Sequence, residues 1–192
     1  KRINKVFDFT LNKFYLTKGL IGATITGEST TLGREGSDYT AAILANMLDA
    51  EYVTVWKDVP GLLNADPKWL HDAEKLEEVS YREAVEMTFS GAKVIHPKTI
   101  KPLQNKNITL FVKSFINPEK EGTLITEEPN LKKIIPVFVR KENQVLLSLL
   151  PKDFSFVMGD NLSRMFHFFM QHGIKVNLVD ASAVSINVCG DD

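Results

Sequence analysis

The chain has 192 residues and nearly balanced charge, with 23 lysines and arginines against 24 aspartates and glutamates. Hydrophobic residues make up 44% of it, as in globular proteins. The lack of a basic excess argues against nucleic acid as the main partner. Cys189 is the single cysteine, which excludes an intramolecular disulfide and a cysteine zinc site. No apolar run approaches the ~20 residues that span a bilayer, and no signal peptide opens the sequence, so we expect a soluble, cytoplasmic protein without a membrane partner.

The first two thirds of the chain alternate strand and helix signals. Apolar and β-branched runs predict strands at 20–25, 52–56 and 108–112. Helices are expected from Ser37 or Asp38, either of which is a good capping residue, through Asp49, and from the capping box at 80–83 towards Gly91. A further helix is expected over 92–105, interrupted near Pro97. This alternation predicts an α/β fold, with a mostly parallel sheet covered on both faces.

The pattern changes after a stretch rich in proline, glycine and glutamate at 115–130. We therefore place a domain boundary there and expect two domains, 1–130 and 131–192. In the second, strands are predicted at 137–139, 145–149, 174–179 and 184–189. Asp160 or Asn161 is expected to cap a helix that runs through Gln171 and is ended by Gly173. The β-α-β-β order is the start of a ferredoxin-like unit, which needs one more helix and strand to be complete.

The loop at 30–38 (TTLGREGSD) is the best candidate for a ligand site. Gly33 and Gly36 allow close backbone approach, Arg34 offers a planar fork that fits a carboxylate, and a helix is expected to begin at Ser37. These features favour a small anionic ligand. A capped helix after a surface loop, with Arg34 in solvent, fits the same residues. The earlier stretch at 22–29 is not a phosphate-binding P-loop, because Glu28 stands where that loop needs lysine.

Two further residues have chemistry to offer. Asp58 follows a predicted strand, at the edge where ligands bind in open α/β sheets. It could contact a ligand, which would be a ribose or a magnesium-bound phosphate. Alternatively, its carboxylate accepts a hydrogen bond from the backbone of its own turn. Lys93 is either a phosphate contact or a solvated lysine. Asp66-Pro67 is expected to be a turn. The four histidines share no metal spacing, so we predict no histidine zinc site and no resident metal. Met165 and Phe169, with their neighbours Met158, Phe166 and Phe168, are expected to pack in the core or at a dimer interface.

Five motifs together resemble those of the aspartate kinases (aspartokinases). They are, in order, 30–38 (TTLGREGSD), 57–61 (KDVPG), 65–67 (Ala-Asp-Pro), 91–97 (GAKVIHP) and 122–123 (Gly-Thr). The resemblance extends over about 19–192. It implies part of an α/β/α sandwich of the amino-acid kinase type, followed by an incomplete ACT regulatory domain. It further implies transfer of the γ-phosphate of ATP to the side-chain carboxylate of L-aspartate, with Mg²⁺ held mainly by the nucleotide. This reaction is the first step in the biosynthesis of lysine, threonine and methionine.

The resemblance also assigns roles to residues. Arg34 matches the arginine that grips the substrate α-carboxylate, and Ser37 and Asp38 match residues that line the aspartate and phosphate region. Asp58 matches the acid beside the nucleotide, and Lys93 matches a lysine near the ATP phosphates. The remaining ATP-side positions depart from the family. Lys57 stands where the family usually has threonine, Leu63 where it often has tyrosine, and Lys68 where it usually has arginine. Glu35 replaces a customary glycine. We expect Lys57 to reach a phosphate or the ribose edge.

In lysine-sensitive relatives, an effector binds between two ACT domains, which implies a homodimer. The corresponding positions are Met158, Gly159, Asp160, Val176, Asn177, Asp180, Ser182 and Ala183. Asn177 replaces an aspartate and Ala183 a glutamate of the lysine-sensitive pattern, so two acceptors for an effector ammonium have lost their charge. We therefore expect lysine to inhibit weakly or not at all, with threonine favoured over lysine if the enzyme has an effector.

The opening Lys-Phe-Gly-Gly-Thr-Ser motif of the family, which supplies a catalytic lysine, is absent from this sequence. The chain resembles the middle of an aspartokinase. We expect that this chain, in isolation, does not phosphorylate aspartate. Two alternatives remain: another amino-acid kinase, such as one acting on glutamate, or a module that binds effector or nucleotide without turnover. The sequence leaves open whether a homoserine dehydrogenase follows.

Overall fold

The computed structural model describes residues 3–92, 94–130, 133–151 and 160–192, and the chain divides into two compact units, Lys1–Arg140 and Lys141–Asp192. The division follows Arg140 rather than Asn130 because hydrogen bonds tie the intervening segment to the first unit. The backbone N–H of Phe138 donates to the carbonyl of Asn64 (2.7 Å), whose side-chain amide donates to the carbonyl of Pro136 (3.2 Å). The strand predicted at 137–139 is wrong, since these residues form no ladder. The assignment of the units to kinase and regulatory domains stays a prediction.

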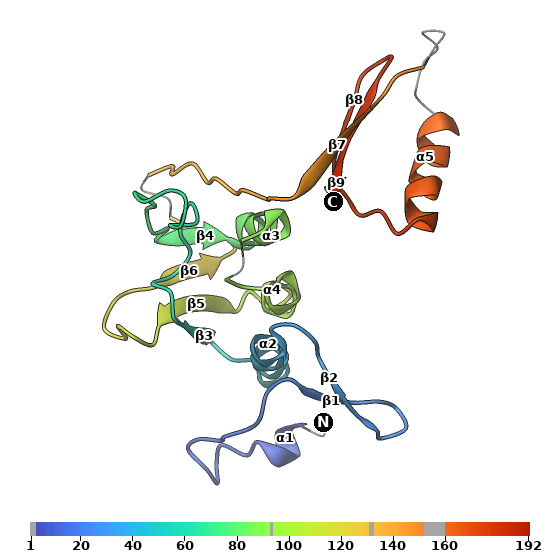
Figure 1. Ribbon diagram of the computed structural model, residues 1–192. Helices are drawn as coiled ribbons and strands as arrows, with labels where there is room; N and C mark the ends of the chain where they lie inside the picture. The colour runs from blue at the N-terminus through green and yellow to red at the C-terminus, as the bar shows by residue number, and fades with distance from the viewer. Residues whose placement is uncertain (1–2, 93, 131–132, 152–159) are drawn as a thin grey trace. The chain divides into compact units, whose positions relative to one another are not determined.

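The first unit is built on a four-stranded sheet with the order β3-β5-β6-β4 (Figure 1). Its strands are β3 (Tyr52–Lys57), β4 (Glu78–Ser80), β5 (Thr109–Ser114) and β6 (Thr123–Thr126). β3 runs parallel to β5 and β4 parallel to β6, whereas β5 and β6 are antiparallel. The predicted α/β class is confirmed. β4 and β6 are additions to the predicted strands.

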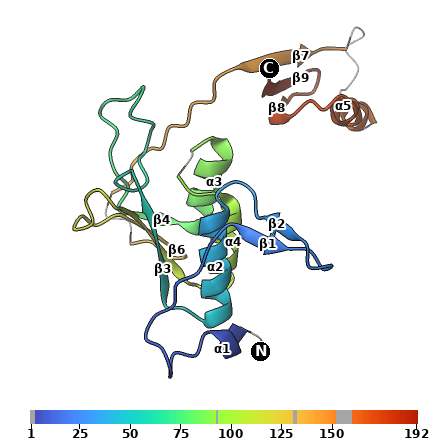
Figure 2. The ribbon, with the colours of Figure 1, turned by 60° about the horizontal axis from the view of Figure 1, so that its bottom comes forward.

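Helices α2 (Gly36–Leu48), α3 (Tyr81–Ser90) and α4 (Pro97–Gln104) lie together on one face of this sheet, as Figures 1 and 2 show. The predicted capping box is present at α3: the Ser80 hydroxyl accepts from the Glu83 N–H (3.1 Å), and the Glu83 carboxylate accepts from the Ser80 N–H (2.9 Å). α4 begins only at Pro97 rather than near 92, because proline suits the first helical position and His96 caps it through Nδ1.

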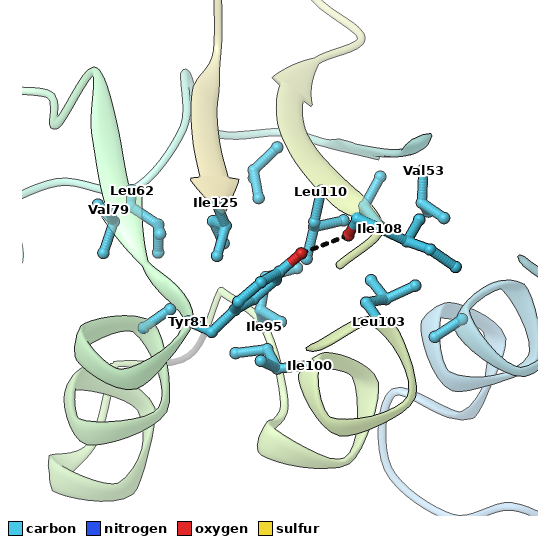
Figure 3. Close-up of a cluster of buried hydrophobic side chains, with 14 of the residues drawn as sticks. Val53, Leu62, Val79, Tyr81, Ile95, Ile100, Leu103, Ile108, Leu110 and Ile125 are labelled. Carbon is cyan, nitrogen blue, oxygen red and sulfur yellow. Dashed lines mark hydrogen bonds between the residues drawn. The ribbon is translucent and has the colours of Figure 1, made fainter. Parts of the chain in front are cut away.

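The hydrophobic core lies between the sheet and these helices (Figure 3). Tyr81, at the start of α3, is 1% exposed and its hydroxyl donates to the carbonyl of Ile108 (2.6 Å). Burial, reinforced by the negative charge of Glu127, raises the pKa of Tyr81 above its ordinary value. The other side chains labelled in Figure 3 come from the strands, from the turns beside them and from α4: Val53, Leu62, Val79, Ile95, Ile100, Leu103, Leu110 and Ile125.

The part of the first unit before α2 is mostly exposed. A short helix, α1 (Ile3–Val6), is followed by an antiparallel hairpin of β1 (Ile21–Ala23) and β2 (Ser29–Thr31). The strand predicted at 20–25 is present in shortened form, but the expectation that it is buried is wrong: Ile21 is 58% exposed. An apolar run alone does not bury a strand that pairs only with a polar partner.

The second unit has the predicted β-α-β-β order: β7 (Gln144–Leu149), α5 (Asp160–Gln171), β8 (Val176–Ala181) and β9 (Ile186–Asp191). Its sheet has the order β7-β9-β8, with both neighbouring pairs antiparallel. A small core buries Phe169 of α5 against β9, with Met165 packed beside it, as predicted. Phe166 and Phe168 are 40% and 53% exposed, so they lie outside this core, and their packing at a dimer interface stays a prediction. Across the described segments of both units, no helix is long and apolar enough to cross a membrane.

Candidate functional site

The loop before α2 adopts a conformation that few residue types tolerate. Gly33 and Glu35 both have positive φ values, 80° and 53°, and Glu35 is the residue that caps α2, without any side-chain capping bond. The predicted caps, Ser37 and Asp38, are therefore wrong: both lie inside the first turn. The helix begins at Gly36, where a Cβ would come within 2.5 Å of the Leu20 side chain, so the close contact favours glycine at this position. The free N–H groups of this first turn provide a place for an anion.

Asp38, in that first turn, meets Lys57 at the last position of β3. The Lys57 Nζ lies 2.7 Å from the Asp38 Oδ2, and the two side chains are only 22% and 13% exposed. Asp38 was predicted to serve the aspartate side of the site and Lys57 the nucleotide side. The structure thus brings one residue of each predicted set into direct contact. Ser37, the neighbour of Asp38, is exposed.

Arg34 precedes Asp38 in the 30–38 motif. It lies at the surface, with its side chain 68% exposed. Its Nε is 3.9 Å from the Glu35 Oε1, a distance at which an exposed ion pair contributes little. The other carboxylate oxygen of Glu35, Oε2, is buried and has no hydrogen-bond partner among the described residues. The guanidinium of Arg34 is therefore exposed and only weakly held, as a carboxylate-binding group needs to be.

The remaining ATP-side residues are dispersed over the segment that follows β3. Asp58 and Lys68 are exposed, and Leu63 forms an isolated antiparallel bridge with Lys75. No hydrogen bond or ion pair joins Asp58, Leu63 or Lys68 to another predicted site residue in the described parts of the chain. The predicted turn at Asp66 is confirmed, since its carboxylate accepts from the Lys68 N–H (2.9 Å). Lys93 lies outside the described residues.

The same segment is fixed by residues to which sequence reasoning gave no role. The buried hydroxyl of Thr123, at the start of β6, accepts from the N–H of Leu62 (2.8 Å) and donates to the carbonyl of Leu76 (2.6 Å). Gly61 passes so close that a Cβ would lie 2.5 Å from that hydroxyl, and a Cβ on Gly122 would lie 1.8 Å from a carbonyl oxygen of β5. The Gly-Thr motif at 122–123 was the available signal, and the structure explains it as the support of the loop after β3.

A cleft of the first unit lies elsewhere. Its volume is about 920 Å³, and it is bounded by β4, α3 and the extended segment at 133–139. None of the predicted site residues that the structure describes lines it. Among the described residues, no group of three or more histidine, cysteine, aspartate or glutamate side chains is arranged to hold a metal ion. The candidate site is therefore the α2 N-terminus and the end of β3 rather than this cleft.

In the second unit, those residues predicted to bind an effector that the structure describes do not form one cluster within the chain. Val176 and Asn177 begin β8, while Asp180, Ser182 and Ala183 lie at or just beyond its other end. The Asn177 Nδ2 donates to the Gln144 Oε1 and to the Asp191 Oδ1, both at 2.6 Å. Met158 and Gly159 lie outside the described residues, and Asp160 begins α5.

Asp191 is the centre of the polar network at the start of β8. Hydrogen bonds from Lys141, Gln144 and Asn177 hold the pKa of its carboxyl well below its usual range. The side-chain amide of Asn177 thus donates its hydrogen bonds to residues of its own chain. This amide is neutral, whereas lysine-sensitive aspartokinases are expected to have a carboxylate at this position.

Comparison with known proteins gives consistent relatives. The chain is 39% identical over 171 residues to lysine-sensitive aspartokinase 3 of Escherichia coli K12, covering 89% of this chain and 38% of that protein. It is 36% identical over 167 residues to chloroplastic aspartokinase 1 of Arabidopsis thaliana, covering 86% and 29%. The chain therefore spans less than two fifths of the length of these relatives.

Solved structures show the same likeness. E. coli aspartokinase III in complex with aspartate and ADP matches with a TM-score of 0.76 at 38% identity, over 95% of this chain and 41% of that one. Aspartate kinase of Clostridium acetobutylicum gives a TM-score of 0.80 at 24% identity, over 96% and 44%, which supports the fold alone. A family model described as "Amino acid kinase family" matches residues 2–114, which is more than half of the 192 residues. The chain therefore belongs to the amino acid kinase family.

Proposed function

We propose that the protein containing this chain is an aspartate kinase, which transfers the γ-phosphate of ATP to the side-chain carboxylate of L-aspartate. The observation that carries the proposal is the arrangement at the α2 N-terminus, where exposed Arg34 precedes Asp38 and Asp38 contacts Lys57 from the end of β3. The likeness to a relative solved with aspartate and ADP supports it. Of the amino-acid kinases considered, we favour the one acting on aspartate because the 30–38 motif is most specific to it.

The proposed roles follow from charge and position. Arg34 binds the α-carboxylate of aspartate through charge-assisted hydrogen bonds, and Ser37 and Asp38 line the region where the side-chain carboxylate and the phosphoryl group meet. The ATP side of the site consists of the residues that flank the nucleotide: Lys57, Asp58, Leu63, Lys68 and Lys93. Mg²⁺, held mainly by the ATP phosphates, supplies neutralising charge. Such transfer depends on positioning and electrostatics more than on covalent help from the protein.

Replacing Arg34 with alanine in the full-length protein tests this assignment. Because the arginine is expected to hold a carboxylate with about 1.5–3 kcal/mol, kcat/KM for aspartate should fall roughly 10- to 100-fold while the KM for ATP stays near normal. The acyl phosphate is trapped as its hydroxamate for the measurement. Arg82→Ala, at an exposed arginine of α3 outside the site, is the matched control.

Three outcomes would count against the proposal. An unchanged kcat/KM for aspartate in Arg34→Ala would remove the role of the arginine. A wild-type protein that phosphorylates glutamate in preference would indicate a glutamate-type kinase. Nucleotide or amino-acid binding without any turnover of the full-length protein would indicate a binding module.

We further propose that the second unit is an ACT domain that dimerises and senses an amino acid, in a cytoplasmic enzyme. Its β-α-β-β order supports this, as does the likeness to E. coli aspartokinase III solved in complex with lysine and aspartate. Because Asn177 is neutral and both hydrogens of its amide are engaged, it offers no charge to an effector ammonium. We expect threonine to inhibit more strongly than lysine, and Asn177→Asp to increase sensitivity to lysine. Half-inhibition of the wild type by micromolar lysine would contradict this.

A further inference from the structure

We propose that Lys57 is a catalytic residue that holds the Asp38 carboxylate in place and presents a cation to the phosphoryl group in transfer. This inference rests on the proposed aspartate kinase function and adds to it a role for Lys57 that differs from simple nucleotide binding. It begins from the contact of 2.7 Å between the Lys57 Nζ and the Asp38 Oδ2. A threonine, usual in aspartokinases at this position, has no positive charge with which to form such a pair.

The path of β3 sets the direction of the Lys57 side chain. Side chains alternate between the two faces of a strand, so Val53, Val55 and Lys57 share one face. Val53 and Val55 are 8% and 6% exposed and belong to the core beneath the helices, so Lys57 extends past the end of that core towards the first turn of α2. Trp56, on the other face, instead lies beneath the Nζ of Lys113, 5.5 Å from its ring centroid.

Partial burial strengthens the pair. With 22% and 13% of the two side chains exposed, solvent and salt screen this attraction less than that between surface charges. Asp38 also lies in the first turn of α2, where the helix dipole favours a negative charge. The carboxylate is therefore held in one place, between the helix end and the lysine.

This arrangement matters for the proposed chemistry because the arriving phosphoryl group is itself negative. An Asp38 carboxylate without a counter-ion would repel it, whereas Lys57 neutralises that charge. The ammonium of Lys57 has three donors and uses one on Asp38, which leaves N–H groups to hydrogen-bond the phosphoryl oxygens. In the transfer, the bond from the γ-phosphorus to the ADP oxygen breaks, with its electron pair remaining on ADP, and a bond to the aspartate carboxylate forms. Lys57 keeps its proton throughout.

Kinetics of the full-length protein distinguish this role from nucleotide binding. Lys57→Met should lower kcat roughly 10- to 100-fold and change the KM for ATP by less than about threefold, because the cation acts on the group in transfer. Lys57→Arg should recover most of kcat, since it restores the charge. If Lys57 only bound the nucleotide, Lys57→Met would instead raise the KM for ATP and remove the salt dependence of ATP binding.

The other end of α2 offers a matched control, where Lys106 pairs with Asp49. Lys106→Met removes a lysine–aspartate pair from the same helix and should leave kcat and both KM values unchanged. Wild-type kcat in Lys57→Met, a loss confined to the KM for ATP, or no recovery in Lys57→Arg would overturn the inference. A wild-type protein that forms no aspartyl phosphate would overturn the proposed function, and the inference with it, so the two failures are distinguishable.

Discussion

Two threonines of the first unit are both fully buried and differ in the hydrogen bonding of their hydroxyls. The hydroxyl of Thr123 bridges the N–H of Leu62 and the carbonyl of Leu76, whereas that of Thr99 has no hydrogen-bond partner among the described residues. Replacement by valine changes each hydroxyl to a methyl group of similar size. The two substitutions therefore isolate the contribution of the hydrogen bonds from that of packing.

We expect Thr123→Val to be strongly destabilising. It leaves a buried N–H and a buried C=O unpaired, and each such group costs about 1–3 kcal/mol, so the free energy of unfolding should fall by about 3 kcal/mol. At about 3 °C per kcal/mol for a unit of this size, Tm should fall by roughly 10 °C. Thr99→Val should be neutral or raise the free energy of unfolding by up to about 1 kcal/mol, because it removes a buried hydroxyl that has no partner.

Urea unfolding of the full chain, followed by circular dichroism, measures both effects at once. The midpoints should differ while the slope with denaturant stays the same, since neither change alters the surface exposed on unfolding. Thr123→Ser, which keeps the hydroxyl, should retain most of the stability. Equal losses in Thr123→Val and Thr99→Val would refute the reasoning, because packing would then account for both.

Two further substitutions test local strain and ionisation. Glu35→Gly should raise the free energy of unfolding by about 1 kcal/mol, because a non-glycine residue with positive φ costs about 1–2 kcal/mol, and the freedom of glycine in the unfolded chain offsets part of the gain. Asn107→Gly, at a φ of 54° that asparagine tolerates, should change Tm little, and an equal gain there would rule out this cause. Burial raises the pKa of Tyr81 in the folded chain above 10.0, so the unfolded chain ionises first as pH rises. The contribution of Tyr81 to stability is then full below pH 10 and is lost as the pH rises through the folded pKa. Tyr81→Phe should flatten the loss of stability in alkaline solution, and unchanged alkaline melting curves would contradict this.

Local signals in the sequence predicted local structure well. The capping box at 80–83 contains within four residues all the groups that its two hydrogen bonds need, and the structure confirms it. β3 was predicted because its own residues are β-branched and aromatic. By contrast, β4 and β6 are 3 and 4 residues long, and each is a strand only because of a partner distant in sequence. No window of the sequence contains that information.

The start of α2 and the candidate site show the same limit. Ser37 and Asp38 are favourable caps, but the helix begins earlier, at Gly36, which lies close to Leu20, a residue distant in sequence. Asp38 and Lys57 were each predicted as site residues, and the family pattern supplied both positions. Their contact joins the first turn of a helix to the end of a strand, so it required the fold to be known.

The strand order of the first unit has a consequence for how the chain folds. β6 is the last of the four strands in sequence, yet it lies between β5 and β4 and pairs with both. During synthesis from the N-terminus, β3, β4, β5 and their helices emerge before it. Until residues 123–126 arrive, β4 has no strand beside it and β5 has an open edge, and such edges invite pairing with other chains. The insertion of β6 is therefore the step that joins β4 to β5, and until it occurs both strands have edges open to pairing with other chains.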